Sequence, residues 1–383
     1  MPHQNSVMHD LVKQVPWTRL EELVLEHRAD EDTRKLTTKR HFLAMLYAQL
    51  SGASSLREIE VGMASHGAQF YHLGGAPVRR STLSEANRGR PAEVFGGLLA
   101  SLMKQAHRGL RQAMKESVYL IDATVLPLND LSADWAHFST GICGAKAHVI
   151  YDPNVDCPIY ASITNRSVND VTAGKEMPIE ADATYVFDLG YYDFAWWAAL
   201  DDKGCRIVTR FKSHTPLTVT ETRAVPAVGP ILSDRVGTLP ERQAKSRKNP
   251  FHKPVREICV VIETGKTLRI LTNDLKADAQ EIADLYKRRW AIELFFRWVK
   301  QTLKIRKFLG TNENAIRIQI AVALIAFLLL RLAHQAQKCT FSLLTFTRLV
   351  RTNLLLRRRI DRLLSNPDDQ PQPPSGQMLL TWN

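Results

Sequence analysis

Apolar residues in the first third of the chain recur at the spacing of helices. Between residues 39 and 50 they repeat at intervals of three and four, which predicts a helix. Ser55 and Glu58 then match a capping box, the pattern in which two side chains satisfy free N–H groups at a helix start, and predict a second short helix. With an amphipathic stretch at about 91–115, the pattern predicts a helical module over residues 1–115.

A third short helix is expected just before residue 90, where Thr82 and Glu85 repeat the capping-box pattern. Three short helices of this kind are compatible with a helix-turn-helix DNA reader. The surface expected to face DNA combines basic and polar residues of this helix: Arg79, Arg80, Ser84, Asn87, Arg88 and Arg90. The alternative is a small helical cap whose basic face is simply solvated.

From residue 118 the pattern changes to that of β-strands. The predicted strands are 118–128, 146–152, 157–165, 183–191 and 206–211, with helices at about 171–179 and 195–204. Three antiparallel-type strands, a helix and then further strands match the order of a ribonuclease H-like α/β fold. We therefore predict a ribonuclease H-like catalytic core whose first part spans residues 116–206.

The remaining chain interrupts and then completes this core. Residues 207–275 contain prolines, a dense basic run at 242–256 and two apparent strands, so we interpret them as a β-rich insertion. The later parts are a core-helix segment at 276–310 (the helix itself at about 277–303), a helical C-terminal region at 311–364 and a Pro-rich, polar tail at 365–383 that is expected to be disordered.

Charge narrows the class of partner. Lys and Arg number 51 against 39 Asp and Glu, a formal net charge of +12, which indicates nucleic acid or an acidic membrane surface. The longest apolar run, 320–330, is too short to span a bilayer and reads as a buried core helix. The basic run at 242–256 and the arginines at 357–359 would bind DNA backbone, which gives salt-dependent affinity; solvated charge is the alternative.

The N-terminus and the cysteines favour a cytoplasmic protein. No apolar signal-peptide core is visible in the first thirty residues. The cysteines are odd in number, widely spaced and without a CxxC pair: Cys143, Cys157, Cys205, Cys259 and Cys339. We interpret them as reduced thiols and expect no zinc site.

The stretch YKRRWAIELFFRWVK carries the most informative spacing in the chain. Tyr286, Arg289, Glu293 and Lys300 are separated by steps of three, four and seven residues. On a helix these steps place all four side chains on one face. A carboxylate there can hold a metal ion, and the two cations can hold the phosphate on which the metal acts.

Two further carboxylates lie at strand positions suited to the same chemistry. Asp122 interrupts an apolar strand, and Asp188 ends another, just before a glycine that permits a tight turn. Alone, each is more simply a turn residue. Two-metal phosphodiester chemistry, however, needs carboxylates that converge from separate elements, and Mg²⁺ suits such a set. Asp122, Asp188 and Glu293 together therefore predict a catalytic triad.

The four-residue spacing matches the YREK signature, so the chain resembles the DDE transposases of bacterial insertion sequences, specifically the insertion-sequence-four family. The motif Asp188 to Tyr191 (DLGY) and the stretch 70–91 (FYHLGGAPVRRSTLSEANRGRP) extend the likeness, which covers about residues 35–340. The resemblance implies that Asp122, Asp188 and Glu293 bind the catalytic metal ions. It also implies that Tyr286, Arg289 and Lys300 contact phosphates near the transposon end.

As an activity, the resemblance implies cut-and-paste transposition. Mg²⁺, with Mn²⁺ expected to substitute, would support cleavage at the terminal inverted repeats and strand transfer into target DNA by a dimer assembled on DNA. No nucleotide cofactor is expected, because the chain has no phosphate-binding GxxxxGK[ST] loop. The further expected DNA contacts are Trp298, Arg79, Arg80, Arg88, Lys245, Arg247 and Lys248.

The chain departs from the family pattern in two places. Many members have Arg after the second acid, where this chain has Leu189. Members that cut through a DNA hairpin hold a flipped base on an aromatic residue of the insertion, commonly Trp, and none occurs between residues 206 and 274. Phe211 or Phe251 are the candidates to replace it. Two other functions stay open: a ribonuclease H-like endonuclease without strand transfer, and a non-catalytic DNA-binding repressor derived from a transposase.

Overall fold

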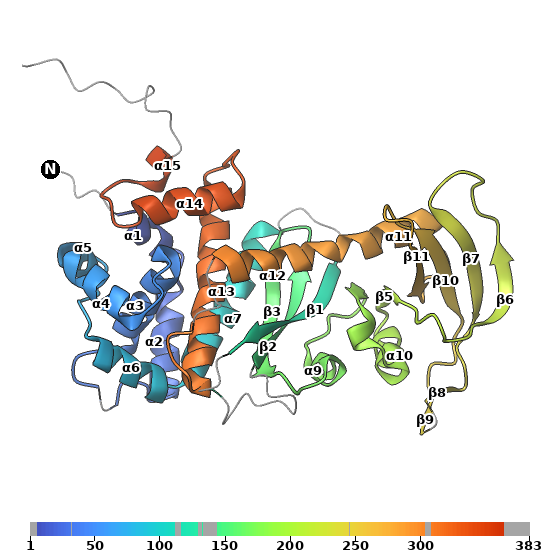
Figure 1. Cartoon of the computed structure of the whole chain (residues 1–383), viewed down its shortest axis with the longest axis horizontal. Coiled ribbons are helices and arrows are strands. Elements are labelled where there is room, and N and C mark those ends of the chain that lie inside the picture. Colours follow the sequence, from blue (N-terminus) through green and yellow to red (C-terminus); the bar gives the residue numbers. More distant parts are fainter. Residues whose placement is uncertain are drawn as a thin grey trace, which may run out of the picture.

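The structure is a computed structural model that describes residues 6–31, 33–111, 116–128, 132, 144–244, 246–302 and 308–363. The molecule is elongated, with helices at one end, a twisted sheet in the middle and further strands at the other end (Figure 1). The predictions made for Cys143, Lys245 and the tail 365–383 lie outside the described residues.

Helices form the N-terminal end of the molecule. They are α1 (Val7–Val12), α2 (Trp17–Glu26), α3 (Thr38–Ser51), α4 (Leu56–Ser65), α5 (Gly67–His72), α6 (Arg80–Gly89) and α7 (Ala92–Leu110). The predicted start of α4 is confirmed, because the Ser55 hydroxyl accepts from the Glu58 N–H at 3.2 Å. The Glu58 carboxylate in turn accepts from the Ser54 N–H at 2.8 Å, one residue earlier than the capping box requires.

The predicted cap of α6 is wrong. The helix begins at Arg80, so Thr82 lies inside it, and its N-cap Arg79 makes no side-chain capping bond. Two residues expected on its outer face are also buried. Asn87 bonds His41 Nε2 at 2.7 Å, and the Arg90 guanidinium donates to the Leu36 carbonyl. These polar contacts hold α6 against the segment around α3, because buried polar groups need partners.

The centre of the molecule is a mixed sheet of nine strands in the order β3-β2-β1-β4-β5-β11-β10-β7-β6. The strands are β1 (Val118–Pro127), β2 (Gly144–Asp152), β3 (Cys157–Asn165), β4 (Thr184–Phe187), β5 (Arg206–Arg210), β6 (Thr218–Arg223), β7 (Ile231–Thr238), β10 (Val255–Val261) and β11 (Thr267–Thr272). The β1-β4-β5 pairs are parallel and all others antiparallel. A separate hairpin pairs β8 (Arg242–Ala244) with β9 (Arg247–Lys248).

The strands of the 207–275 segment continue the central sheet, since β11 pairs directly with β5. One face of the sheet is covered by the short helices α9 (Asp170–Glu176) and α10 (Phe194–Asp202). Between β4 and α10 lies the 3₁₀ turn η2 (Leu189–Tyr191). The strand predicted to end at residue 191 stops at Phe187, because η2 begins two residues later.

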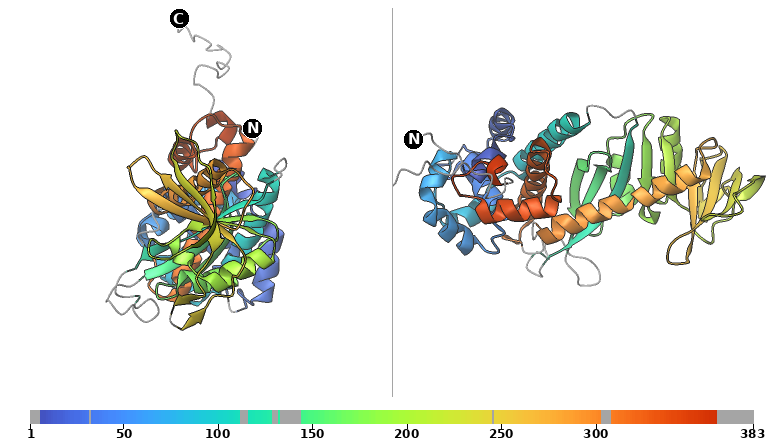
Figure 2. Two further views of the ribbon diagram at one scale, coloured as in Figure 1. Left: turned by 90° about the vertical axis from the view of Figure 1, so that its right-hand side faces the viewer. Right: turned by 90° about the horizontal axis from the view of Figure 1, so that it is seen from above.

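The signature helix runs along the other face of the sheet as α11 (Ala279–Arg288) and α12 (Trp290–Thr302), which the right view of Figure 2 shows. The single helix predicted at 277–303 is therefore interrupted at Arg289. The break is slight, since Arg289 keeps helical dihedral angles and its N–H donates to the Tyr286 carbonyl, three residues back, at 3.1 Å. At this point the backbone hydrogen bond spans three residues instead of the four of an α-helix, and the helix axis continues in the same direction.

The C-terminal helices α13 (Glu313–Ala336), α14 (Leu343–Asn353) and α15 (Ile360–Leu363) pack among the N-terminal ones. By length and composition α13 could cross a membrane, but 83% of its most apolar window is buried inside the protein. The expectation of a buried core helix is confirmed. The helix is longer than the apolar run that suggested it.

Candidate active site

Sheet register brings the two predicted aspartates together. In the parallel pair β1–β4, Ile121 lies opposite Phe187, so Asp122 and Asp188 follow at neighbouring positions on adjacent strands. By strand alternation both lie on the face of Leu120 and Val186, whose side chains pack in the same core as α12 and α13. The carboxylates are thus presented to the signature helix.

A tight turn fixes the Asp188 carboxylate. Its Oδ1 accepts from the Gly190 N–H at 2.8 Å and caps the 3₁₀ turn η2. A Cβ at position 190 would lie 3.0 Å from Asp188 Oδ1 and from Asp170 Oδ2, so a larger residue there would force these two carboxylates to shift. The small size of Gly190 in the DLGY motif therefore leaves room for the two neighbouring carboxylates.

Arg289 connects the signature helix to the first aspartate. Its Nη2 donates to Glu293 Oε1 at 2.5 Å, and its Nη1 lies 3.7 Å from Asp122 Oδ2. The guanidinium also lies 5.8 Å from the centre of the Tyr286 ring. Three of the four signature residues and Asp122 thus form one cluster.

An open cavity of about 390 Å³ adjoins this cluster. Its lining residues are Asp122, Ala123, Thr124, Glu293, Phe296, Arg297, Lys300 and Gln301. Lys300, the fourth signature residue, is therefore on the same face as Glu293, as the spacing predicts. Sequence reasoning missed Arg297 and Gln301, although steps of four and eight residues from Glu293 place them near the same face.

Burial makes the Asp122 carboxylate costly to ionise. Its pKa is raised to about 7, first by burial and then by the charge of Asp188, while Arg289 opposes the shift. A buried carboxylate beside another carboxylate needs a counter-charge to stay ionised. In the structure that charge comes from the Arg289 guanidinium.

The cluster fits a hard divalent cation in its donor chemistry. Carboxylate oxygens from two strands and one helix are the ligands that Mg²⁺ takes in phosphoryl-transfer sites. Among the described residues, no group of three or more His, Cys, Asp or Glu side chains lies close enough together to hold a metal ion as the side chains stand. Arg289, in contact with both Asp122 and Glu293, supplies the positive charge there instead.

Tyr191, which the sequence analysis named only as the end of the DLGY motif, places a further polar group near the candidate triad. Its side chain is fully buried, and within the described residues its hydroxyl has no hydrogen-bond partner. Burial raises its pKa, and the carboxylates Asp170, Asp122 and Asp188 raise it further, in that order. The hydroxyl is thus an orphaned donor within the field of the candidate triad.

The aromatic residue exposed beside the site is Trp290, not the predicted Trp298. Trp298 packs edge-on against Phe327, with ring centroids 5.0 Å apart, and is partly buried. Trp290 is 50% exposed, with the Arg297 guanidinium 5.7 Å from its ring centre. The helix phase decides this, because one face of α12 must pack on the core.

The candidates for holding a flipped base in the insertion are also buried. Phe211 and Phe251 are 3% and 2% exposed, and the Arg269 guanidinium stacks on Phe211 at 4.5 Å. Both rings belong to the core between the sheet and α10. The interpretation of either as a free stacking surface is therefore wrong for this structure.

The remaining predicted DNA contacts are dispersed over the surface. Arg79, Arg80 and Arg88 are exposed on or beside α6, while Arg247 and Lys248 are exposed on the β8–β9 hairpin. Arg90, which was expected on the α6 surface, is buried. Sequence alone could not separate it from its neighbours, since all four arginines occur within twelve residues.

Comparison with known proteins gives family matches in two parts of the chain. The family described as "Transposase DDE domain" matches residues 113–329, which include all three candidate acids and the signature residues. A domain of unknown function (DUF4372) matches residues 3–76.

Three curated relatives extend along most of the chain. A Sinorhizobium fredii (strain NBRC 101917 / NGR234) protein named as a transposase, y4zB, is 40% identical over 76% of this chain and 81% of its own length. A transposase for insertion sequence element IS5377 of Geobacillus stearothermophilus is 30% identical, over 75% and 76%. A transposase for insertion sequence element IS4SA of Synechocystis sp. (strain ATCC 27184 / PCC 6803 / Kazusa) is 27% identical, over 68% and 73%.

Among solved structures, the chain is similar to the piggyBac transposase in a cryo-EM synaptic complex with hairpin DNA. The sequence identity is 11% and the TM-score 0.43, over 93% of this chain and 80% of that one. Similarity at this level does not define the fold. The family match over residues 113–329 and the relatives at 40% and 30% identity do establish the family: the chain belongs to the transposases that share the Transposase DDE domain.

Proposed function

We propose that this protein is a cut-and-paste transposase of the insertion-sequence-four family. It would cut double-stranded DNA at the terminal inverted repeats of its element and join the freed ends to target DNA. The observation that carries the proposal is the contact of Arg289 with both Asp122 and Glu293, beside Asp188 in register. Two acids from separate elements therefore contact one cation, and the third acid follows the neighbouring strand.

Asp122, Asp188 and Glu293 would hold two Mg²⁺ ions, with Mn²⁺ as a substitute. Bound there, such ions activate the attacking oxygen and stabilise the leaving oxygen of phosphodiester cleavage. Arg289 would then leave the carboxylates and turn to a DNA phosphate, since the ions take over its charge. Tyr286 and Lys300 would hold neighbouring phosphates, and the cavity beside Lys300 offers them access.

The other predicted surfaces would guide DNA to the site. In this proposal residues 1–115 bind the element's end through Arg79, Arg80 and Arg88, and the 207–275 insertion contacts backbone through Arg247 and Lys248. The core at 116–206 and 276–310 would be ribonuclease H-like, and the protein would act as a cytoplasmic dimer on DNA. If a hairpin intermediate forms, Trp290 is the exposed aromatic beside the site that suits base stacking.

The test is metal-dependent cleavage and joining of DNA that carries the inverted repeats flanking the gene. We expect the wild type with Mg²⁺ to nick, cut and join, and Glu293→Gln to lose all three while it still binds DNA. Asp284→Asn, an acid-to-amide change at an exposed position of α11, is the matched control and should keep activity. Loss of activity in that control alone would contradict the assignment.

Two other results would favour the alternative functions. Cleavage without joined products would indicate an endonuclease of related chemistry. Binding without cleavage by the wild type, in Mg²⁺ or Mn²⁺, would indicate a repressor derived from a transposase.

A further inference from the structure

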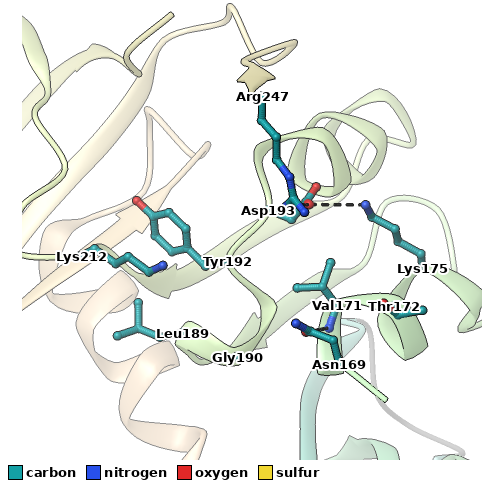
Figure 3. Close-up of a pocket in the computed structure, with 10 residues that line it drawn as sticks. All are labelled: Asn169, Val171, Thr172, Lys175, Leu189, Gly190, Tyr192, Asp193, Lys212 and Arg247. Atoms are coloured by element: carbon teal, nitrogen blue, oxygen red, sulfur yellow. Dashed lines mark hydrogen bonds and ion pairs between the residues drawn. The ribbon is translucent and has the colours of Figure 1, made fainter. Parts of the chain in front are cut away.

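A second polar cavity lies beside the turn that carries Asp188. Its volume is about 250 Å³, and Leu189 and Gly190 form part of its wall (Figure 3). It opens where the parallel strands β4 and β5 end, since Asp188 follows the first and Lys212 the second. Ligands of α/β sheets commonly bind at this edge. The cavity is distinct from the one lined by Glu293 and Lys300.

Three cations and one carboxylate line this second cavity. Lys175 Nζ and Arg247 Nη1 lie 3.3 Å and 3.5 Å from the same oxygen, Oδ2 of Asp193. The Lys212 ammonium lies 4.3 Å from the centre of the Tyr192 ring, and within the described residues no carboxylate pairs with it. Three positive charges against the one of Asp193 leave a formal charge of +2.

The walls of the cavity are held in place by neutral and charge-assisted bonds. Gln243 of the β8–β9 hairpin accepts from the Phe194 N–H at 2.8 Å and donates to the Tyr192 carbonyl at 2.9 Å. These two bonds dock the hairpin on the start of α10. Arg247 of the same hairpin points to Asp193, as Figure 3 shows.

The loop that carries Lys212 is clamped as well. One Arg269 nitrogen, Nη1, donates to the Lys212, Ser213 and Thr215 carbonyls at 2.6, 2.9 and 3.1 Å. Asp193 is fixed by its second oxygen, which accepts from the Trp196 N–H at 2.8 Å and caps α10. The backbone that carries Lys212 and the counter-ion Asp193 are therefore both held in place by the surrounding structure.

We propose that this cavity binds a backbone phosphate of DNA held at the triad, with Lys175, Lys212 and Arg247 as its ligands. The inference rests on the proposed function, because Leu189 and Gly190, which line the cavity, directly follow Asp188 of the candidate triad. A cavity below the roughly 300–1,000 Å³ of small-molecule sites suits a single charged group better than a whole nucleotide or cofactor. A phosphate would replace Asp193 as the partner of Lys175 and Arg247 and would give Lys212 an anion.

The test compares the wild type, the double variant Lys175→Gln, Lys212→Gln and the control Lys203→Gln. Lys203 is exposed at the opposite end of β5 and makes the same chemical change outside the cavity. Binding to duplex end DNA is measured between 50 and 200 mM KCl. The cavity would hold one phosphate, and each lost phosphate contact should reduce the slope of log affinity against log salt by about 0.9, so the double variant should lose up to about 0.9.

The phosphate could belong to the element's end or to the target, and a second arm separates the two sources. Pre-cut ends are joined to target DNA by each variant. A reduced slope on end DNA assigns the phosphate to the element. An unchanged slope with joining reduced about tenfold or more assigns it to the target.

Unchanged slope and unchanged joining in the folded double variant, or an equal loss in Lys203→Gln, would overturn the proposal. Folding is checked by the melting temperature, which should stay at the wild-type value because both lysines are at least partly exposed. Failure of the transposase function itself has a different signature, since the wild type would then neither cut nor join.

Discussion

The positive charge of Arg289 lies where the candidate site would otherwise hold a metal ion. The guanidinium stands between Asp122 and Glu293, where the donor set suits a metal ion. A cation in that place keeps acids together that would otherwise repel one another at close range. In the proposed function, a metal ion would replace the Arg289 guanidinium, which requires only that the Arg289 side chain moves and not that the fold changes.

This exchange predicts stabilisation by metal. Adding Mg²⁺ to the metal-free wild type should raise the melting temperature, and chelation should reverse it, because an ion bound only by the folded state adds about 2.7 kcal/mol at 100 times its Kd. Asp122→Asn should lose the effect. Asp284→Asn, which changes an exposed acid of α11, should retain it, and an equal response of all three proteins would refute specific binding.

His41 predicts a pH effect in the helical end. Burial lowers its pKa to about 3 from the ordinary 6.5, despite the bond to Asn87. Between those values the unfolded chain binds a proton that the folded chain excludes. Stability is therefore lost as pH falls below about 6.5, by at most about 1.4 kcal/mol per unit for one histidine.

Urea unfolding at pH 7 and pH 5 measures this effect. His41→Gln should reduce the difference in unfolding free energy between the two pH values by about 2 kcal/mol, since glutamine does not titrate. His27→Gln, at the half-buried end of α2, is the control and should keep the wild-type difference. A wild-type pH dependence in His41→Gln would show that another group carries it.

At the scale of elements, the sequence predicted most strands and helices but not how they join. The strands β1, β2 and β3 lie within two residues of their predicted bounds, because alternation and β-branched residues are local signals. The pairing of β5 with β11 was not predictable, since it joins segments some sixty residues apart and depends on tertiary packing. The same applies to the two aspartates. The sequence identified Asp122 and Asp188 as candidates, but it did not predict that the parallel register of β1 and β4 places them next to each other.

Two adjacent glycines of α7 give a matched pair for testing helix packing. A Cβ at Gly96 meets nothing within 4 Å, whereas one at Gly97 would lie 2.7 Å from the buried Leu23 of α2. Gly96→Ala should therefore raise the unfolding free energy by about 0.5–1 kcal/mol through helix propensity. Gly97→Ala should give less than this or a net loss, because Leu23 must move.

Chemical denaturation of the two variants decides between propensity and packing. A gain of equal size at both positions would mean that α2 and α7 separate more easily than the contact implies.

At the scale of the whole molecule, α13 unites parts that the sequence suggested were separate modules. It packs on α7, α3, α6, α1 and α14, as well as on α12 and β3. Its Asn314 side chain donates to the Asn87 and Arg90 carbonyls and accepts from the Ala92 N–H at 3.1 Å. The turn between α6 and α7 is therefore fixed to the helix that follows α12.

Asn314→Ala should destabilise the protein by about 2–4 kcal/mol, because it leaves several backbone groups of a part-buried turn unpaired. Asn353→Ala removes one bond, to the Leu349 carbonyl within α14, and should cost less than about 1 kcal/mol. The free energy of unfolding in urea measures both. Similar losses in the two variants would argue against a special role for the α6–α7 turn.

The α1 segment is completed by residues made at the other end of the chain. The Met8 N–H donates to the Leu354 carbonyl at 2.8 Å, and the Val7 N–H to that of Leu356 at 3.3 Å. In a nascent chain these two N–H groups therefore stay without their native partners until almost all of the chain has left the ribosome. A chain that ended before position 343 would lack both carbonyls that accept from α1. Its N-terminal helices should unfold more readily than those of the full chain, because two buried backbone N–H groups would lose their partners.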